Sequence, residues 1–139
     1  MYIIEYGEYI YLIVLFLYCM SIQWKNNIFD LALLDKSKEF ETMAMAITIA
    51  HPVVDLKDVV NIKNEFLETP LMISCMHCKT LDLPKFILEC KPELDATDTF
   101  GHNLFDYASK NKNGIKKQLI DLIGTVYLQT DEQLEPLTL

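Results

Sequence analysis

Arginine is absent from the sequence, and all twelve basic residues are lysine. Twenty acidic residues outnumber them, so the net charge is −8. Phosphate recognition favours the planar, bidentate guanidinium of arginine and a positive local potential. The composition therefore argues against nucleic acid as a partner.

Glycine is scarce as well, and the four glycines form no phosphate-binding loop. No serine lies in a nucleophile elbow, and three histidines are scattered along the chain at positions 51, 77 and 102. Because neighbouring helical residues do not face each other, His77 is badly placed to activate Cys78 within one helix. We therefore expect a protein that is not an enzyme and that uses no cofactor.

Cysteine is limited to four residues, two of which form the motif Cys75-Met76-His77-Cys78. Such a motif binds a metal or acts as a dithiol in some proteins. A closed zinc site needs further ligands, and the chain has no second C-x-x-C or H-x-x-x-H. We expect structural cysteines, no metal, and a reducing intracellular environment. A small thiol or metal-binding protein using Cys75, His77 and Cys78 remains the alternative.

Hydrophobic residues, by contrast, make up 51% of the 139 residues. This is enough material for the core of one domain and excludes a disordered chain. The clearest pattern lies between residues 68 and 111. Thr69 followed by Pro70 is typical of a helix start, and Asp82 is the expected cap of a second helix. Apolar residues at helical spacing follow on one face of that second helix: Leu83, Phe86, Ile87 and Cys90.

A further helix start is expected at Asn103, 34 positions after Thr69, which is the spacing of a helical repeat. Thr69 to Cys75 resembles the Thr-Pro-Leu-His-x-Ala-Ala opening of the ankyrin-repeat family, with Met72 in place of histidine. Leu83 to Leu88 is similar to the second helix of that family, and Leu94 to Phe105 to its hairpin. Gly101 stands where the hairpin needs a positive φ. Lys91 replaces the glycine that usually follows the second helix.

Two further segments resemble the same unit. Asn27 to Ala32 parallels Asn103 to Ala108, and a helix is expected to end at His51 and Pro52. After a turn at residues 111–114, an apolar stripe indicates another helix: Ile115, Leu119, Leu122, Ile123 and Val126. The resemblance implies an all-α ankyrin-repeat solenoid with units at about 24–67, 68–101 and 102–128, followed by an acidic flexible tail at 129–139.

Residues 1–23 are expected to form a hydrophobic helix, because residues 9–20 are uninterrupted apolar or aromatic residues. A run of this length is more often buried than membrane-spanning, so we favour a helix that caps the first unit. A membrane anchor formed by residues 9–24 remains open. In that case, the lysines that follow the run would place the repeats on the cytoplasmic side.

The arm at residues 52–67 is longer than the family pattern. Its β-branched residues alternate partly with charges, which favours an extended finger or a short strand pair. Insertions in solenoids often lie on the binding face. The alternative is that Val54, Leu56, Val60 and Ile62 cover the neighbouring unit.

What the resemblance implies is a non-catalytic protein–protein interaction module, whose arms and first helices form the binding surface. Phe100 is the leading candidate contact, because it is an aromatic residue at an arm tip; packing against Phe66 is the alternative. The other candidate residues come from both arms and one first helix: Thr97, Thr99, His102, Met76, His77, Lys57, Val59, Lys63, Asn64 and Phe66. Family and composition together suggest a cytoplasmic adaptor, or an effector-like protein of an intracellular bacterium or virus that acts on a protein in the host cytoplasm.

Overall fold

The structure, a computed structural model, describes residues 24–134, and the burial of side chains through residue 130. All regular secondary structure in this part of the chain is helical, which confirms the all-α prediction. Residues 24–33 form the first helical segment. The helices that follow are α2 (Ser37–Ala50), α3 (Leu56–Val60), α4 (Pro70–His77), α5 (Asp82–Glu89), α6 (Leu104–Ser109) and α7 (Lys116–Leu134).

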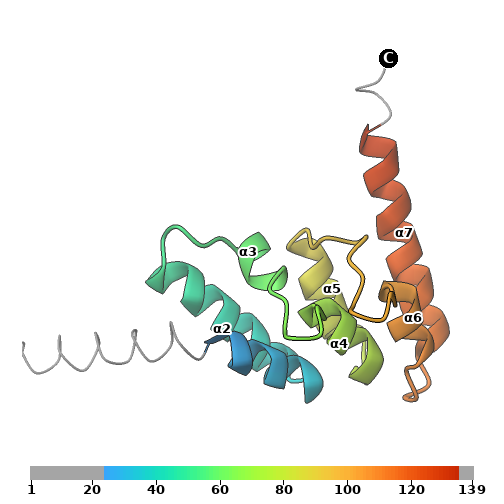
Figure 1. The fold of residues 1–139 in the computed structure, drawn as a ribbon, viewed down its shortest axis with the longest axis horizontal. Helices are drawn as coiled ribbons and strands as arrows, with labels where there is room; N and C mark the ends of the chain where they lie inside the picture. Colours follow the sequence, from blue (N-terminus) through green and yellow to red (C-terminus); the bar gives the residue numbers. More distant parts are fainter. Residues whose placement is uncertain (1–23, 135–139) are drawn as a thin grey trace, which may run out of the picture.

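The helices pack as neighbouring pairs (Figure 1). Helix α4 contacts α5, and α6 contacts α7, so consecutive helices lie side by side. Contacts between pairs join α2 to α5 and α4 to α6. Each helix of the middle pair α4–α5 therefore has a neighbour from a different pair, and the short helix α3 lies against α2.

Two helix starts lie where the sequence predicts them. The Thr69 hydroxyl accepts a hydrogen bond from the Met72 amide at 3.3 Å, and Pro70 occupies the first turn of α4. At α6, Asn103 and Asp106 form a reciprocal capping box with N···O distances of 3.0 and 2.9 Å. Side-chain caps of this kind stabilise a helix by about 1 kcal/mol, because they satisfy amides that lack an intrahelical acceptor.

Helix α5 differs from its prediction by one residue. Asp82 is the first helical residue, and the capping position before it is held by Leu81. The predicted apolar face is present, with Leu83 and Ile87 fully buried. Phe86 meets Phe40 of α2 edge to face, with ring centroids 6.1 Å apart, and this contact joins α5 to α2.

The long arm contains a helix, and the predicted extended finger or strand pair was wrong. Asp55 and Asp58 form a capping box that starts α3. This turn of helix places Val59 and Val60 inside the core with no exposed surface. The alternative in which the arm covers its neighbour agrees with this packing: Val54, Leu56 and Ile62 are also packed against the core.

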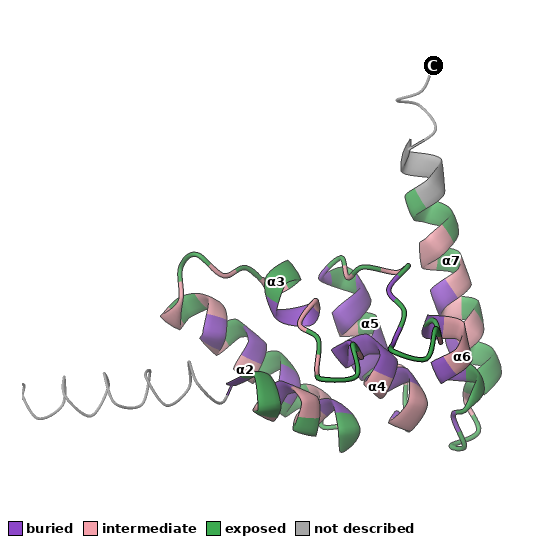
Figure 2. Cartoon of the chain, viewed as in Figure 1, coloured by how far each residue is buried: buried purple, intermediate pink, exposed green. Residues whose placement is uncertain are grey.

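Buried residues are concentrated where the helix pairs meet, most densely in α4 and α5 (Figure 2). Helix α7 buries Leu119 and Ile123 completely, as its predicted stripe requires. It also continues to Leu134, beyond the predicted start of a flexible tail at residue 129.

The predictions for residues 1–23, namely a capping helix or a membrane anchor, lie outside the described residues, as does the end of the predicted tail at 135–139. Within residues 24–134, no helix combines the length and the apolar character that crossing a membrane requires.

Candidate functional site

The tips of the two arms are held together by their backbones. The carbonyl oxygen of Phe66 accepts hydrogen bonds from the Thr99 amide at 2.9 Å and from the Thr99 hydroxyl at 2.7 Å. These two residues are 33 positions apart in the chain. The hydrogen bonds therefore fix the relative position of Phe66 in the first arm and Phe100 in the second.

The second arm tip is a tight turn organised by Asp98. One carboxylate oxygen of Asp98 accepts from the amides of Phe100 and His102, at 2.9 and 2.8 Å. Gly101 adopts a φ of 81°, as predicted, which a side chain would disfavour. The turn is therefore rigid at the point where it presents the Phe100 ring.

The Phe100 ring extends into solvent and is 76% exposed, while Phe66 is 49% exposed. Both border a hollow of about 450 Å³ between the arm tips and the first helices of two pairs. We call this hollow the arm groove, and it is lined by Phe66, Glu68, Met76, Asp98, Phe100, His102, Tyr107 and Lys110. Four residues singled out from the sequence are thus brought together: Phe66, Met76, Phe100 and His102.

The arm groove has a polar, hydrogen-bonded side formed by Tyr107 and two carboxylates. The Tyr107 hydroxyl lies 2.8 Å from an oxygen of Glu68 and 2.6 Å from an oxygen of Asp98. Burial, followed by these two hydrogen bonds, raises the pKa of Tyr107 well above its ordinary value. Tyr107 therefore stays protonated and acts as a hydrogen-bond donor.

Asp98 stays charged although it is buried. Burial alone would raise its pKa, but hydrogen bonds from the Tyr107 hydroxyl and from the His102 and Phe100 amides outweigh burial and lower the pKa to about 2. His102 Nδ1 also lies 3.3 Å from this carboxylate. The groove consequently contains a fixed negative charge at neutral pH.

The remaining candidate residues do not line the arm groove. Thr97 is exposed beside it, and Thr99 supplies the link between the arms. Lys63 lies 3.6 Å from the carboxylate of Glu93. Asn64 forms the turn of the first arm, because its side chain bonds to the Phe66 and Glu68 amides and to the Glu68 carboxylate.

Three candidates have other positions. His77 is half-buried at the end of α4, where its carbonyl accepts from the Asn113 amide group. Lys57 borders a different hollow. Val59 is fully buried, so its side chain is inaccessible to a partner, which corrects its selection as a contact residue.

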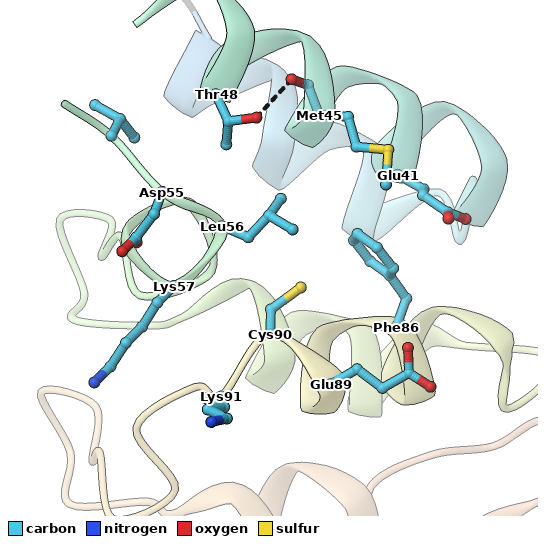
Figure 3. Close-up of a pocket in the computed structure, with 11 residues that line it drawn as sticks. Glu41, Met45, Thr48, Asp55, Leu56, Lys57, Phe86, Glu89, Cys90 and Lys91 are labelled. Carbon is cyan, nitrogen blue, oxygen red and sulfur yellow. Dashed lines mark hydrogen bonds between the residues drawn. The ribbon is translucent and has the colours of Figure 1, made fainter. Parts of the chain in front are cut away.

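The second hollow, which Lys57 borders, has a volume of about 780 Å³ and lies between α2, α3 and α5. Apolar side chains project into it: Met45, Leu56, Phe86 and Cys90 (Figure 3). The carboxylates of Glu41 and Glu89 lie to one side of these apolar groups, and the lysines 57 and 91 to the other (Figure 3). This hollow suits an apolar group. The hydrogen bonds between Phe66 and Thr99 that join the two arms lie outside it.

The Cys75-x-x-Cys78 motif is part of the core. Both side chains are fully buried. Burial and the neighbouring Cys78 raise the pKa of Cys75 well above its ordinary value. Burial and the Asp35 carboxylate raise the pKa of Cys78 to about 11. Both thiols therefore stay protonated at neutral pH, which opposes nucleophilic reactivity. In the part of the chain that the structure describes, no three His, Cys, Asp or Glu side chains gather as a metal site would require.

No protein-family model matches the chain, and no curated protein is significantly similar to it. The resemblance to ankyrin repeats therefore depends on the sequence motifs alone.

Sequence reasoning missed four residues of the arm groove: Glu68, Asp98, Tyr107 and Lys110. The turn chemistry of Asp98 carries a local signal, because aspartate three residues before glycine is typical of a tight turn. The link from Tyr107 to Glu68 spans 39 positions and has no local signal. Only the packing of α4 on α6 brings these residues together.

Proposed function

We propose that this protein is a non-catalytic interaction module of the ankyrin type, which binds another protein through the arm groove. The packing of α2 on α5 and of α4 on α6 supports a stack of helix pairs. The similar caps at Thr69 and Asn103, 34 positions apart, support a repeated unit.

The exposed ring of Phe100 is the observation that carries this proposal. A phenylalanine that is 76% exposed contributes little to the core. Its closest ring neighbour is His102, with centroids 6.3 Å apart in a tilted arrangement. The ring is therefore not covered by Phe66, in contrast to the alternative of mutual packing between the arms. Buried aromatic side chains are frequent anchors of protein interfaces. Rigid presentation lowers the entropy cost of binding.

The partner is proposed to be a protein of a host cell, with this chain acting as a small effector-like adaptor in the cytoplasm. The support is compositional: the chain is rich in Lys, Ile and Asn and lacks arginine. A tethered form of the same adaptor, anchored by residues 9–24, is the second proposal, and it changes the location of the partner but not the binding surface.

Replacing Phe100 by alanine tests the proposal. Full-length wild-type and Phe100→Ala proteins are immobilised, and the proteins retained from a eukaryotic cell lysate are compared by quantitative mass spectrometry. Candidates that depend on Phe100 are then purified and titrated by calorimetry. We expect at least a tenfold loss of affinity, since a central aromatic anchor contributes about 2 kcal/mol or more. The urea unfolding midpoint should stay unchanged.

Two matched variants serve as controls. Val53→Ala removes an apolar side chain that is 93% exposed and lies outside the arm groove, so affinity should be unchanged. Met45→Ala shortens an apolar side chain that lines the second hollow, so it removes apolar contacts there. If Met45→Ala weakens binding and Phe100→Ala does not, the partner docks in the second hollow and the assignment to the arm groove is wrong.

A further inference from the structure

The polar side of the arm groove contains more acceptors than donors. The Tyr107 hydroxyl has one proton but lies within hydrogen-bond distance of Glu68 Oε2 and Asp98 Oδ2. It can donate fully to only one of them. The other carboxylate oxygen then lies close to a lone pair of the Tyr107 hydroxyl oxygen. One carboxylate oxygen therefore lacks a hydrogen-bond donor.

Groups within the protein supply Asp98 with donors, including the Phe100 and His102 amides, but they meet the demand of Glu68 only in part. The second oxygen of Glu68 accepts from the Asn64 side chain at 2.9 Å, on the side of the first arm. His102 Nδ1 lies near Asp98. The Lys110 ammonium lies 5.8 Å from the centroid of the Tyr107 ring. Among the described residues, no lysine forms an ion pair with Glu68 or Asp98.

The walls of the same groove are aromatic. Phe66 and Phe100 border it with exposed rings, and their backbones are tied together through Thr99. A guanidinium group is planar, stacks on aromatic faces and donates two parallel hydrogen bonds to carboxylates. The ammonium group of lysine is not planar and does not donate two parallel hydrogen bonds. The combination of aromatic walls and a Glu68 carboxylate that lacks a donor thus matches arginine better than any other side chain.

We propose that the arm groove receives an arginine side chain of the partner protein, between Phe66 and Phe100, with its guanidinium donating to the Glu68 carboxylate. This inference rests on the proposed function and specifies the chemistry of its partner. The net charge of −8 supports it, because an acidic protein attracts basic segments before contact.

Glu68→Gln is the most informative variant. The side-chain amide would donate to the Tyr107 oxygen, which removes the excess of acceptors and one negative charge. We therefore expect opposite effects on two quantities: the urea unfolding midpoint should stay the same or rise, whereas arginine binding should weaken at least fivefold. A residue needed only for structure would lower stability when replaced.

The probe is the capped tripeptide acetyl-Gly-Arg-Gly-amide, titrated to millimolar concentration into the full-length ¹⁵N-labelled protein. We expect saturable shifts of the Phe66, Phe100 and Gly101 amide signals. The matched peptides contain lysine or norleucine in place of arginine, and we expect at least threefold weaker binding for lysine and no saturable shifts for norleucine. Equal binding of norleucine, or of lysine, would overturn the assignment of arginine.

Two further variants complete the experiment. Glu65→Gln removes an exposed carboxylate near the groove but not in it, and it should leave the titration unchanged. Lys110→Ala removes a competing positive charge and should tighten arginine binding about twofold or more. If Glu68→Gln leaves arginine binding unchanged, the inference is wrong. If Glu68→Gln also retains the partner while Phe100→Ala loses it, the proposed function stands without the arginine.

Discussion

Among residues 24–134, three residues other than glycine adopt the left-handed backbone conformation: Asp35, Leu67 and Lys91, with φ values of 54°, 61° and 59°. For an L-residue this conformation costs about 1 kcal/mol. Lys91 follows α5 at the position where the ankyrin pattern has glycine. Its positive φ is a conformation that glycine at this position would adopt without steric cost.

Lys91→Gly should therefore stabilise the protein by up to about 1 kcal/mol, because glycine adopts a positive φ without steric cost. Urea unfolding followed by circular dichroism measures the change. Lys85→Gly is the control, since the same substitution at an exposed position inside α5 should destabilise by about 1 kcal/mol. A loss of stability in both variants would contradict the backbone argument.

The carboxylate of Asp98 makes stability depend on pH. Its pKa in the folded state is about 2, below the ordinary 3.8. Its contribution is therefore fully present above about pH 4 and is lost as the pH falls towards 2. Asp98→Asn should be less stable than the wild type at pH 7, and the difference should shrink between pH 4 and 2. Urea midpoints across this range test it; a constant difference would mean that the charge contributes nothing.

At the scale of elements, local signals predicted local structure. The caps at Thr69 and Asn103 form with residues three positions later, so the local sequence is sufficient to predict them. The long arm was misjudged because alternating β-branched residues also occur in a buried helical turn. There, the capping box of Asp55 and the burial of Val59 and Val60 outweigh β-propensity. The polar side of the arm groove could not be predicted, because it depends on distant residues.

The end of helix α4 is hydrogen-bonded by side chains from the turn that follows α6. The Asn111 side chain is buried and donates hydrogen bonds to the carbonyls of Cys75 and Cys78, both at 2.9 Å. Asn113 donates to the carbonyls of His77 and Cys78. Carbonyls at a helix end need such partners, so the turn after α6 caps α4.

Asn111→Ala should accordingly destabilise the protein by about 2–3 kcal/mol, because it leaves buried carbonyl groups without donors. Thermal and urea unfolding measure the loss. Lys112→Ala changes the exposed neighbouring residue and should have an effect below about 0.5 kcal/mol. Similar effects of the two substitutions would show that the buried amide is not required.

For the molecule as a whole, contacts between helix pairs couple the stability of each pair to that of its neighbours. Trp24, the only tryptophan, is buried at the start of the described residues, 7% exposed. Its fluorescence reports on the surroundings of Trp24, whereas circular dichroism reports on all helices.

We expect urea unfolding curves from Trp24 fluorescence and from circular dichroism to coincide, as two-state behaviour requires. Phe86 of α5 packs on Phe40 of α2, so unfolding of α2 would expose part of α5. The two helices should therefore unfold together. Phe86→Ala should separate the two curves. In the wild type, a fluorescence transition at lower urea concentration than the circular dichroism transition would show that the region around Trp24 unfolds independently.

The capping of α4 by Asn111 also has a consequence during synthesis. Cys75 leaves the ribosome 36 residues before Asn111. At ordinary translation rates this interval lasts about 2–7 s, which far exceeds the microsecond time in which a helix forms. Helix α4 thus spends seconds without the hydrogen bonds from Asn111 at its C-terminal end. Chaperones that recognise nascent chains would meet this protein with α4 exposed, and its final structure would form only after the last unit has been synthesised.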